Sequence, residues 1–303
     1  MERLLKIGTR GSPLALYQAR LVQSLLPCDV EIVIFKTSGD KIKGDLKDFG
    51  GKGLFTKELE EALLDGRVDM AVHSMKDVPT VNQDGLTIGA VLKREDPRDA
   101  FISVNCAGIS DLRQGAVIGT ASIRRRAQLL ALRPDIKFKL LRGNVGTRLQ
   151  KVTAGEFDAT FLACAGLNRL GMPEVITEVV APEIMLPAPA QGAIGIEVRQ
   201  TDTQTADVIK TLNDEATRLA ITAERAFLQA LDGSCRTPIA ALAEIKNGAL
   251  YFRGEIIAKD GSLRVARSEI ISAPTLSLAH DLGLRLGRDI KDEIGDRIMW
   301  DEA

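Results

Sequence analysis

The stretch from Val68 to Thr80 brings together side chains suited to electrostatic or acid–base chemistry. Its first five residues form a short apolar run, which is typical of a buried strand. The polar residues that follow it are His73, Ser74, Lys76 and Asp77. In an open α/β sheet, groups just past the carboxyl end of a strand lie where ligands bind. Asp77 is therefore a candidate catalytic carboxylate; the alternative is that it caps a turn before Pro79, with Lys76 as its solvated neighbour.

Arginines stand at or just past the ends of several other expected strands, and arginine forks bind carboxylate or phosphate through two parallel bonds. They are Arg10, Arg124, Arg125, Arg142, Arg148 and Arg169. Residues 124–126 are three arginines in the first turn of an expected helix, where cations oppose the helix dipole and need an anion. Because consecutive helical residues diverge by about 100°, at most two of them can share one ligand, and Arg124 and Arg125 are the expected pair. The pattern indicates a large, polyanionic ligand.

Cys235 follows a glycine and a serine on an expected loop and is the best candidate for a reactive thiol. An exposed, inert thiol is the alternative. Cys164 lies in an apolar run and is expected to be a buried small hydrophobic residue. With His73 and His280 as the only histidines and no Cys-x-x-Cys pair, the sequence predicts no metal site.

The composition is that of an ordinary globular chain of 303 residues, with 45% hydrophobic and 27% charged residues. A formal net charge of -1 argues against nucleic acid or a membrane surface as a partner. The first residues lack the apolar core of a secretory signal and no run reaches transmembrane length, so the cytoplasm is the expected compartment. Nothing indicates oligomerisation, and a monomer is expected.

Strands and helices alternate through the first two thirds of the chain, which predicts α/β lobes with doubly wound sheets. The expected strands are 4–8, 30–36, 68–72, 86–92, 116–119, 138–141, 159–163 and 193–198, and the expected helices 14–26, 54–64 and 123–132. Ser12 and Pro13 suit the start of the first helix. Arg10 and that helix start could together bind an anion; the alternative is a solvated Arg10 at an ordinary helix start. The Gly- and Lys-rich segment 39–53 is expected to be a mobile loop, either a lid or a plain surface loop.

Two segments, 93–98 and 186–192, are expected to cross between lobes. The last third predicts a small α+β domain with a three-stranded antiparallel sheet. Its expected helices are 214–231 and 276–294, and its expected strands 239–245, 250–258 and 263–272, joined by turns at Asn247-Gly248 and Asp260-Gly261. The predicted domains are 1–92 with 193–212, 98–187, and 214–303, with the ligand clasped in a cleft between the first two.

Six long motifs recur in the order of one known family: residues 8–16 (GTRGSPLAL), 51–59 (GKGLFTKEL), 73–80 (HSMKDVPT), 94–101 (REDPRDAF), 141–148 (LRGNVGTR) and 165–170 (AGLNRL). Over essentially its whole length the chain resembles the porphobilinogen deaminase (hydroxymethylbilane synthase) family. The resemblance implies a cytoplasmic transferase of tetrapyrrole (heme, porphyrin) biosynthesis, with two lobes like those of periplasmic binding proteins and a C-terminal domain. Such an enzyme condenses four porphobilinogens head to tail with loss of ammonia and releases hydroxymethylbilane by hydrolysis.

The resemblance also implies a dipyrromethane cofactor, made from the substrate and joined by a thioether to Cys235. It assigns the catalytic carboxylate to Asp77, which would stabilise positive charge on the pyrrole. The residues implied to hold the cofactor are Cys235, Lys76, Asp77, Thr120, Ser122, Arg124, Arg125 and Arg148. Those implied on the substrate side are Arg10, Ser12, Arg142, Arg169 and Gln191.

The chain departs from the family pattern at two places. Ser234 stands where a glycine often precedes the cysteine, and Asp48, beside Lys47, stands where some relatives have a lysine. The lysine contacts of the loop, Lys52 included, are left open. Two other classes compete with the enzyme: a non-catalytic two-lobed anion-binding protein, and an effector-binding regulator that would need a DNA-reading module. Both predict that function survives Cys235→Ala.

Overall fold

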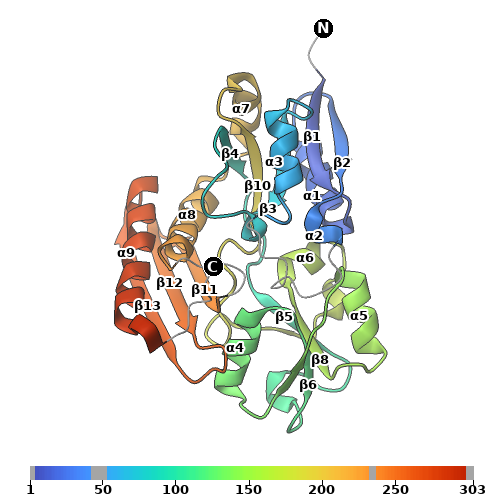
Figure 1. Cartoon of the computed structure of the whole chain (residues 1–303), viewed down its shortest axis with the longest axis vertical. Helices are drawn as coiled ribbons and strands as arrows, with labels where there is room; N and C mark the ends of the chain where they lie inside the picture. Colours follow the sequence, from blue (N-terminus) through green and yellow to red (C-terminus); the bar gives the residue numbers. More distant parts are fainter. Residues whose placement is uncertain (1–3, 42–52, 232–236, 298–303) are drawn as a thin grey trace. The chain divides into compact units, whose positions relative to one another are not determined.

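The computed structural model describes residues 4–41, 53–231 and 237–297 (Figure 1). The chain forms two compact units, Met1–Glu95 with Ala193–Arg218, and Asp96–Gly192 with Leu219–Ala303. The second unit contains both regions that the sequence assigns to domains 2 and 3, and the division into three domains stays a prediction.

The first unit is built on a five-stranded mixed sheet in the order β2-β1-β3-β10-β4. Its strands are β1 (Leu5–Arg10), β2 (Val30–Phe35), β3 (Met70–Ser74), β4 (Leu86–Val91) and β10 (Ile194–Arg199). Its helices are α1 (Pro13–Leu25), α2 (Ser38–Lys41), α3 (Lys57–Leu64) and α7 (Thr203–Ile209), with 3₁₀ turns η2 (Met75–Asp77) and η5 (Lys210–Leu212). Strand β1 runs parallel to β2 and β3, and β10 runs antiparallel to β3 and β4. The carboxyl ends of β1 and β3 therefore meet at one edge of the sheet.

Residues next to the first turns of α1 and α3 determine where these helices begin. The Oγ atom of Ser12 accepts a hydrogen bond from the amide of Ala15 (3.3 Å) and caps α1, with Pro13 as first helical residue, as expected. Helix α3 begins three residues later than predicted. Gly53 adopts φ 80° there, and its carbonyl accepts from the amides of Thr56 and Lys57. This turn leaves Phe55 outside the helix.

The second unit contains another five-stranded mixed sheet, in the order β7-β6-β8-β5-β9. Its strands are β5 (Asp99–Ser103), β6 (Val117–Gly119), β7 (Lys137–Lys139), β8 (Ala159–Ala163) and β9 (Glu178–Val179). Its helices are α4 (Ile123–Leu132), α5 (Val145–Thr153) and α6 (Cys164–Arg169), with 3₁₀ turns η3 (Ile109–Asp111) and η4 (Pro173–Val175). Strand β5 was not predicted. The expected crossing ends at residue 98, and no element was expected for the apolar residues that follow it. It pairs antiparallel with β8 and β9.

The same unit holds the predicted three-stranded antiparallel sheet, in the order β11-β12-β13. The strands are β11 (Ile239–Lys246), β12 (Ala249–Ile257) and β13 (Arg264–Ser272), and helices α8 (Glu215–Ala230) and α9 (Leu276–Ile294) precede and follow them, with η6 (Gly295–Arg297) after α9. Asn247 and Gly248 both have positive φ (52° and 74°), as a tight hairpin turn requires. The predicted turn is confirmed.

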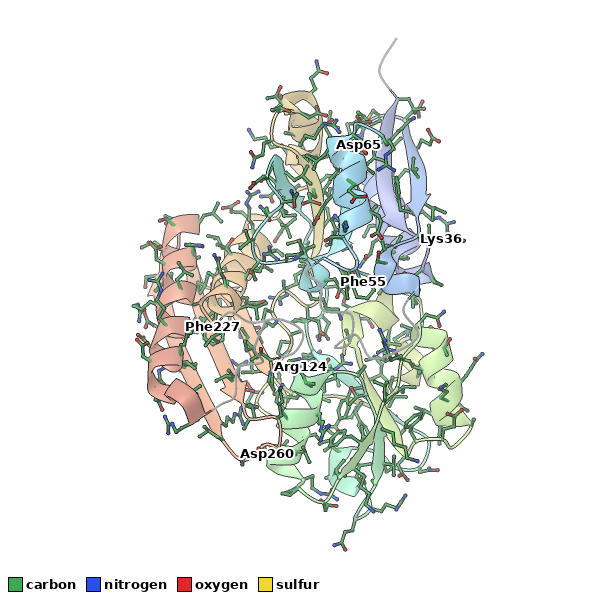
Figure 2. All side chains as sticks on the ribbon, in the orientation of Figure 1. Lys36, Phe55, Asp65, Arg124, Phe227 and Asp260 are labelled. Atoms are coloured by element: carbon green, nitrogen blue, oxygen red, sulfur yellow. The ribbon has the colours of Figure 1, made fainter. Side chains whose placement is uncertain are left out.

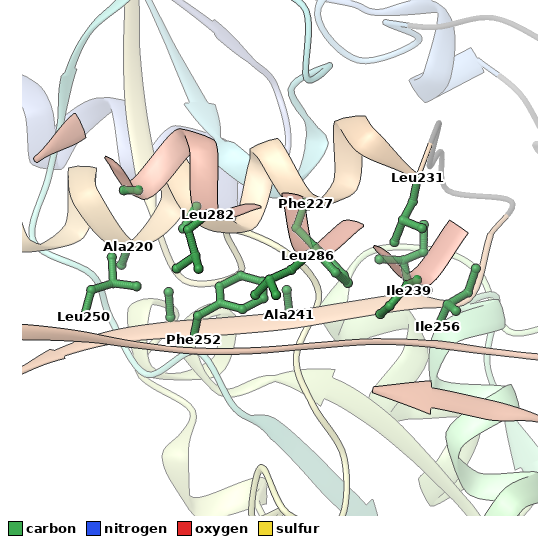
Figure 3. Packing of buried hydrophobic residues seen from close by; sticks show 14 of the residues in the cluster. Ala220, Phe227, Leu231, Ile239, Ala241, Leu250, Phe252, Ile256, Leu282 and Leu286 are labelled. Atoms are coloured by element: carbon green, nitrogen blue, oxygen red, sulfur yellow. The ribbon is translucent and has the colours of Figure 1, made fainter. Parts of the chain in front are cut away.

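Helices α8 and α9 cover one face of this sheet (Figure 3). The rings of Phe227 and Phe252 meet edge to face, with centroids 5.3 Å apart and both side chains buried. A Cβ on Gly283 of α9 would lie 2.2 Å from the carbonyl oxygen of Ala223 on α8, so the close approach of these helices requires glycine. The predicted fold class, two α/β sheets with a small α+β portion, is confirmed. Within the described ranges, no helix is long and apolar enough to cross a membrane.

Candidate active site

A pocket in the first unit lies where the carboxyl ends of β1 and β3 meet. Register pairs Ile7 with Met70 and Gly8 with Ala71, so the residues after each strand come out side by side. The pocket is lined by Arg10, Ser12, Leu14, Ala15, Gln18, Phe55, Thr56, Val72, His73, Ser74 and Asp77. The structure thus brings Asp77 into one pocket with Arg10 and Ser12, which lie more than 60 residues earlier in the chain.

Asp77 ends the short turn η2 and is exposed. No residue in the described part of the chain donates a hydrogen bond to its carboxylate, which is consequently open to a donor from a bound molecule. Lys76 is exposed on the same turn. The alternative interpretation of Asp77 as a turn cap finds no bond in the structure to support it.

Arg10 is held by an aromatic contact that the sequence analysis missed. Its Cζ atom lies 4.3 Å from the centroid of the Phe55 ring (Figure 2 labels Phe55). An aromatic ring under a guanidinium restricts where that group can lie. Phe55 belongs to the motif at 51–59, but nothing in its spacing indicated a partner 45 positions earlier in the chain.

A buried polar pair, His73 and Glu197, contributes one member, His73, to the lining of the pocket. Nε2 of His73 lies 3.1 Å from Oε2 of Glu197 on β10, and the two side chains are 4% and 1% exposed. The other oxygen of Glu197, Oε1, has no hydrogen-bond partner among the residues described. Nearby, burial raises the pKa of Glu60 on α3.

In the second unit, Arg124 and Arg125 converge on one carboxylate, that of Asp99, which is fully buried (Figure 2 labels Arg124). Nη1 of Arg124 donates to Oδ2 (2.7 Å), and Nε and Nη2 of Arg125 donate to Oδ1 (3.1 and 2.7 Å). Burial alone would raise the pKa of Asp99, but the charges of the two arginines outweigh it and hold the pKa well below its usual range. Arg124 and Arg125 thus share an anion that belongs to the chain, and the expected sharing of one bound ligand stays a prediction. Arg126 instead lies over the Phe138 ring, 5.7 Å from its centroid.

Gln191 and Arg169 are also tied to backbone and side chains of the second unit. Nε2 of Gln191 is within hydrogen-bond distance of the carbonyl of Pro97 (2.8 Å) and of Oδ1 of Asp99 (3.0 Å). Nη2 of Arg169 donates to the carbonyl of Gly192 (2.7 Å). Both side chains are buried, at 1% and 9% exposure. The direct substrate contacts expected of them stay a prediction.

Four further predicted residues lie at helix starts of the second unit. Oγ of Ser122 accepts from the amide of Arg125 and caps α4, and Oγ1 of Thr120 accepts from the amide of Ser122. Nε of Arg148 donates to the carbonyl of Gly143 (2.8 Å) at the start of α5, and Arg142 precedes that turn. All four are partly exposed. They belong to a different unit from Arg10 and Asp77, and their meeting in one cleft stays a prediction.

Two other expectations concern cysteines and the glycine-rich loop. Cys235, Lys47, Asp48 and Lys52 lie outside the described residues. Cys164 is 1% exposed, and burial raises the pKa of its thiol to about 12, which confirms a buried, unreactive residue.

Comparison with known proteins bears directly on this site. A family model described as "Porphobilinogen deaminase, dipyromethane cofactor binding domain" matches residues 5–207, and one described as "Porphobilinogen deaminase, C-terminal domain" matches residues 218–292. The chain belongs to the porphobilinogen deaminase family. The porphobilinogen deaminase of Paracoccus denitrificans is 50% identical over 305 residues, covering 98% of this chain and 95% of its own. The chloroplastic porphobilinogen deaminase of Pisum sativum is 48% identical and covers 97% of this chain and 82% of its own.

Solved structures of binding proteins are also similar at low sequence identity. A periplasmic substrate-binding protein of an ABC transporter from Coxiella burnetii aligns with a TM-score of 0.44 at 15% identity, over 71% of this chain and 94% of its own. A methionine-binding protein aligns with a TM-score of 0.42 at 13% identity, over 73% and 93%.

The family match includes the pocket residues and the Asp99 cluster, since both lie within residues 5–207. The description of the family model that matches residues 5–207 names a dipyrromethane cofactor binding domain. This agrees with the cofactor that the sequence resemblance implies. Sequence reasoning missed three residues at these places: Asp99, Phe55 and Glu197. Asp99 and Phe55 contact predicted site residues, and Glu197 contacts His73 of the pocket, each across a long stretch of sequence.

Proposed function

We propose that this chain catalyses the porphobilinogen deaminase reaction, a transferase reaction that joins four porphobilinogens head to tail and releases hydroxymethylbilane. Each addition expels ammonia from the aminomethyl carbon, and water releases the finished product. The observation that carries the proposal is the open carboxylate of Asp77 in a pocket that it shares with Arg10.

Asp77 has the role of stabilising charge. As ammonia leaves, positive charge develops on the pyrrole, and a carboxylate already in place interacts with that charge without reorganisation. No described residue donates a hydrogen bond to this carboxylate, and an acceptor already engaged in the fold would bind a pyrrole N–H more weakly. Removing one such stabilising group typically slows turnover by about 10²–10³.

Arg10 has the role of binding the substrate. Porphobilinogen carries two carboxylates, and a guanidinium held over the Phe55 ring is a group that binds a carboxylate. Ser12, at the start of α1, places a helix N-terminus in the same pocket, where negative charge is favoured. The pocket therefore has an anion-binding part and an open carboxylate.

The residues of the second unit fit a cofactor that carries carboxylates. Arg124 donates its two bonds through Nη1 alone, and no described residue accepts a hydrogen bond from its Nε or Nη2. Thr120, Ser122, Arg125, Arg148 and, from the first unit, Lys76 complete the proposed set, and Cys235 is the proposed attachment point. When bound, the dipyrromethane group supplies the primer to which pyrrole units are added.

The decisive experiment weighs the intact protein before and after addition of porphobilinogen, with Cys235→Ser as the control. We expect the purified protein to exceed its chain mass by two deaminated porphobilinogen units, or to gain that excess on addition of substrate, while the control stays at chain mass. A protein that keeps its bare mass and makes no hydroxymethylbilane, yet binds porphobilinogen, would instead be the two-lobed anion-binding protein.

The proposal includes a monomer in the cytoplasm that uses no nucleic acid, membrane or metal ion. The chloroplastic relative indicates that compartment differs among family members. Sedimentation of the purified chain tests the monomer, and fractionation of the source cells tests the compartment.

A further inference from the structure

Both Arg124 and Arg125 contact the carboxylate of Asp99. Neither the motifs nor the residue spacing of the sequence indicated a role for Asp99. It is the first residue of β5, and its side chain is 0% exposed. Three side chains, those of Arg124, Arg125 and Gln191, donate hydrogen bonds to its two oxygens. A fully buried carboxylate with this many donors is fixed in one orientation.

The two arginines use their nitrogens differently. Arg125 engages all three, with Nε and Nη2 on Asp99 and Nη1 on the carbonyl of Phe161 (2.6 Å). Among the described residues, Arg124 finds acceptors for Nη1 only, on Asp99 and on the carbonyl of Leu186 (2.6 Å). Nε–H and Nη2–H point to the same side of a guanidinium and form the fork that takes a carboxylate with two parallel bonds. The fork of Arg125 is hydrogen-bonded to Asp99, whereas the fork of Arg124 has no acceptor among the described residues.

The charges around Arg124 favour an additional anion. Asp99 carries one negative charge against two arginines, and a further carboxylate with an electrostatic influence on Arg124 is that of Glu255 of β12. Glu255 is itself engaged with Arg264, whose Nε donates to Oε2 (2.7 Å), and it makes no ion pair with Arg124. The cluster of Asp99, Arg124 and Arg125 is left with one net positive charge in a buried setting.

The segment that Arg124 contacts is fixed as well. Gln128, one turn further along α4, donates from Nε2 to the carbonyl of Leu186 (2.9 Å) and accepts from its amide (2.7 Å). Arg124 therefore has both of its Nη1 acceptors held in place, Leu186 by Gln128 and Asp99 by Arg125 and Gln191. Its fork can point in one direction only.

We infer that Asp99 is a positioning residue, which uses Arg125 as an internal brace and so presents the fork of Arg124 to a carboxylate of the bound pyrrole cofactor. This inference rests on the proposed function. It divides the arginine pair that the family resemblance treats alike: Arg124 binds, and Arg125 supports.

The test is the rate at which apo-protein acquires cofactor mass, because loading does not depend on later turnover. Apo-protein from cells that make no porphobilinogen is incubated with porphobilinogen and sampled by intact-mass measurement. Asp99→Glu keeps the negative charge and the two carboxylate oxygens, but moves the carboxylate further from the backbone by the length of one methylene. Asp99→Asn keeps the shape and removes the charge. Asp158→Glu is the matched control, since Asp158 also pairs with an arginine, Arg113, and a backbone amide of this unit.

We expect Asp99→Glu to load about 10- to 100-fold more slowly than the parent protein, since a misplacement of about 1 Å has this size of effect. Asp158→Glu is expected to load at the parent rate. Thermal unfolding of each variant shows that it is folded at the assay temperature, so slow loading cannot be attributed to unfolding. Should Asp99→Asn unfold, Asp99→Glu still decides, because it retains the ion pair.

Parent-like loading by folded Asp99→Glu would overturn the inference and leave Asp99 as a structural ion-pair residue. Equal slowing in Asp158→Glu would do the same, because the effect would then be a general one of the unit. A parent protein that never gains mass would contradict the proposed function itself, which is a separate outcome.

Discussion

Nε2 of His73 and Oε2 of Glu197 lie 3.1 Å apart, although 124 residues of sequence separate them. The pair joins β3 to the antiparallel strand β10 and is almost completely shielded from water. His73 also lines the pocket that contains Asp77. The turn that carries Asp77 thus follows a strand whose last residues are fixed by a buried polar contact.

A double-mutant cycle measures this contact. We expect Glu197→Leu and His73→Leu each to lower the free energy of unfolding, because each leaves a buried polar partner unsatisfied, at a cost of about 1–3 kcal/mol. The double variant should lose less than the sum of the two, with a coupling energy of about 0.5–3 kcal/mol. Urea unfolding of the four proteins gives the cycle, and strictly additive losses would show that the two side chains do not interact.

Asp77→Asn should separate catalysis from stability. The Asp77 side chain is exposed and accepts no hydrogen bond from the described residues. The melting temperature of the Asp77→Asn protein should therefore stay at the parent value. Turnover should fall by about 10²–10³, because the amide carries no charge to stabilise the developing cation. Asp84→Asn, an exposed aspartate seven residues on, is the matched control. Undiminished turnover in Asp77→Asn would remove Asp77 from the proposed mechanism.

Phe55→Leu should weaken substrate binding through Arg10. Leucine keeps apolar contact but not the aromatic face under the guanidinium, a contribution of about 0.5–1 kcal/mol at a partly exposed site. KM should rise by about two- to fivefold with little change in kcat, as for an interaction made equally in the ground and transition states. A fall in kcat at constant KM would mean that Phe55 acts in the chemical step instead.

Local patterns in the sequence were sufficient for much of the fold. The cap at Ser12, the hairpin at Asn247-Gly248 and the burial of Cys164 follow from residue types and neighbours, and the structure has each of them. Asp77 and Arg10 could be placed in a site because parallel strands end at one edge.

The contacts that orient the site could not be predicted in this way. Asp99 meets Arg124, Arg125 and Gln191 across 25, 26 and 92 residues, and these pairings depend on strand order. Strand β5 itself was missed, so its first residue was left without an element after the charged crossing at 93–98. Three arginines at a helix start did indicate an anion, but nothing in the sequence could show that a side chain of the chain supplies it.

The acid stability of the fold should depend on Asp99. Its pKa is depressed in the folded state, so the unfolded chain binds the proton more tightly. The stabilisation is therefore fully present above the unfolded value, about 3.9, and is lost as the pH falls towards the folded value. Asp99→Asn should lower the free energy of unfolding at pH 7 by about 3–5 kcal/mol, the cost of breaking a buried ion pair. The deficit should shrink below pH 4; a deficit that stays constant with pH would contradict the depressed pKa.

Glu255 should behave in the opposite sense. Burial raises its pKa, and the opposing charge and hydrogen bond of Arg264 do not fully offset this. The folded protein therefore holds the proton more tightly than the unfolded chain, and stability falls as the pH rises from about 4.3 through the folded value. Glu255→Gln imitates the protonated form, so its free energy of unfolding should equal or exceed that of the parent at pH 7. This advantage should vanish near pH 4.

Glu244→Gln on the neighbouring strand is the matched control. Its exposed pair with Lys246 should change stability by less than about 1 kcal/mol at either pH. A clear loss of stability in Glu255→Gln at pH 7 would show that the ion pair with Arg264 outweighs the cost of burying the charge. Urea unfolding at both pH values distinguishes these outcomes by the sign of the difference in free energy of unfolding between Glu255→Gln and the parent. The variant is the more stable at pH 7 if the buried charge of Glu255 destabilises the fold, and the less stable if that charge stabilises it.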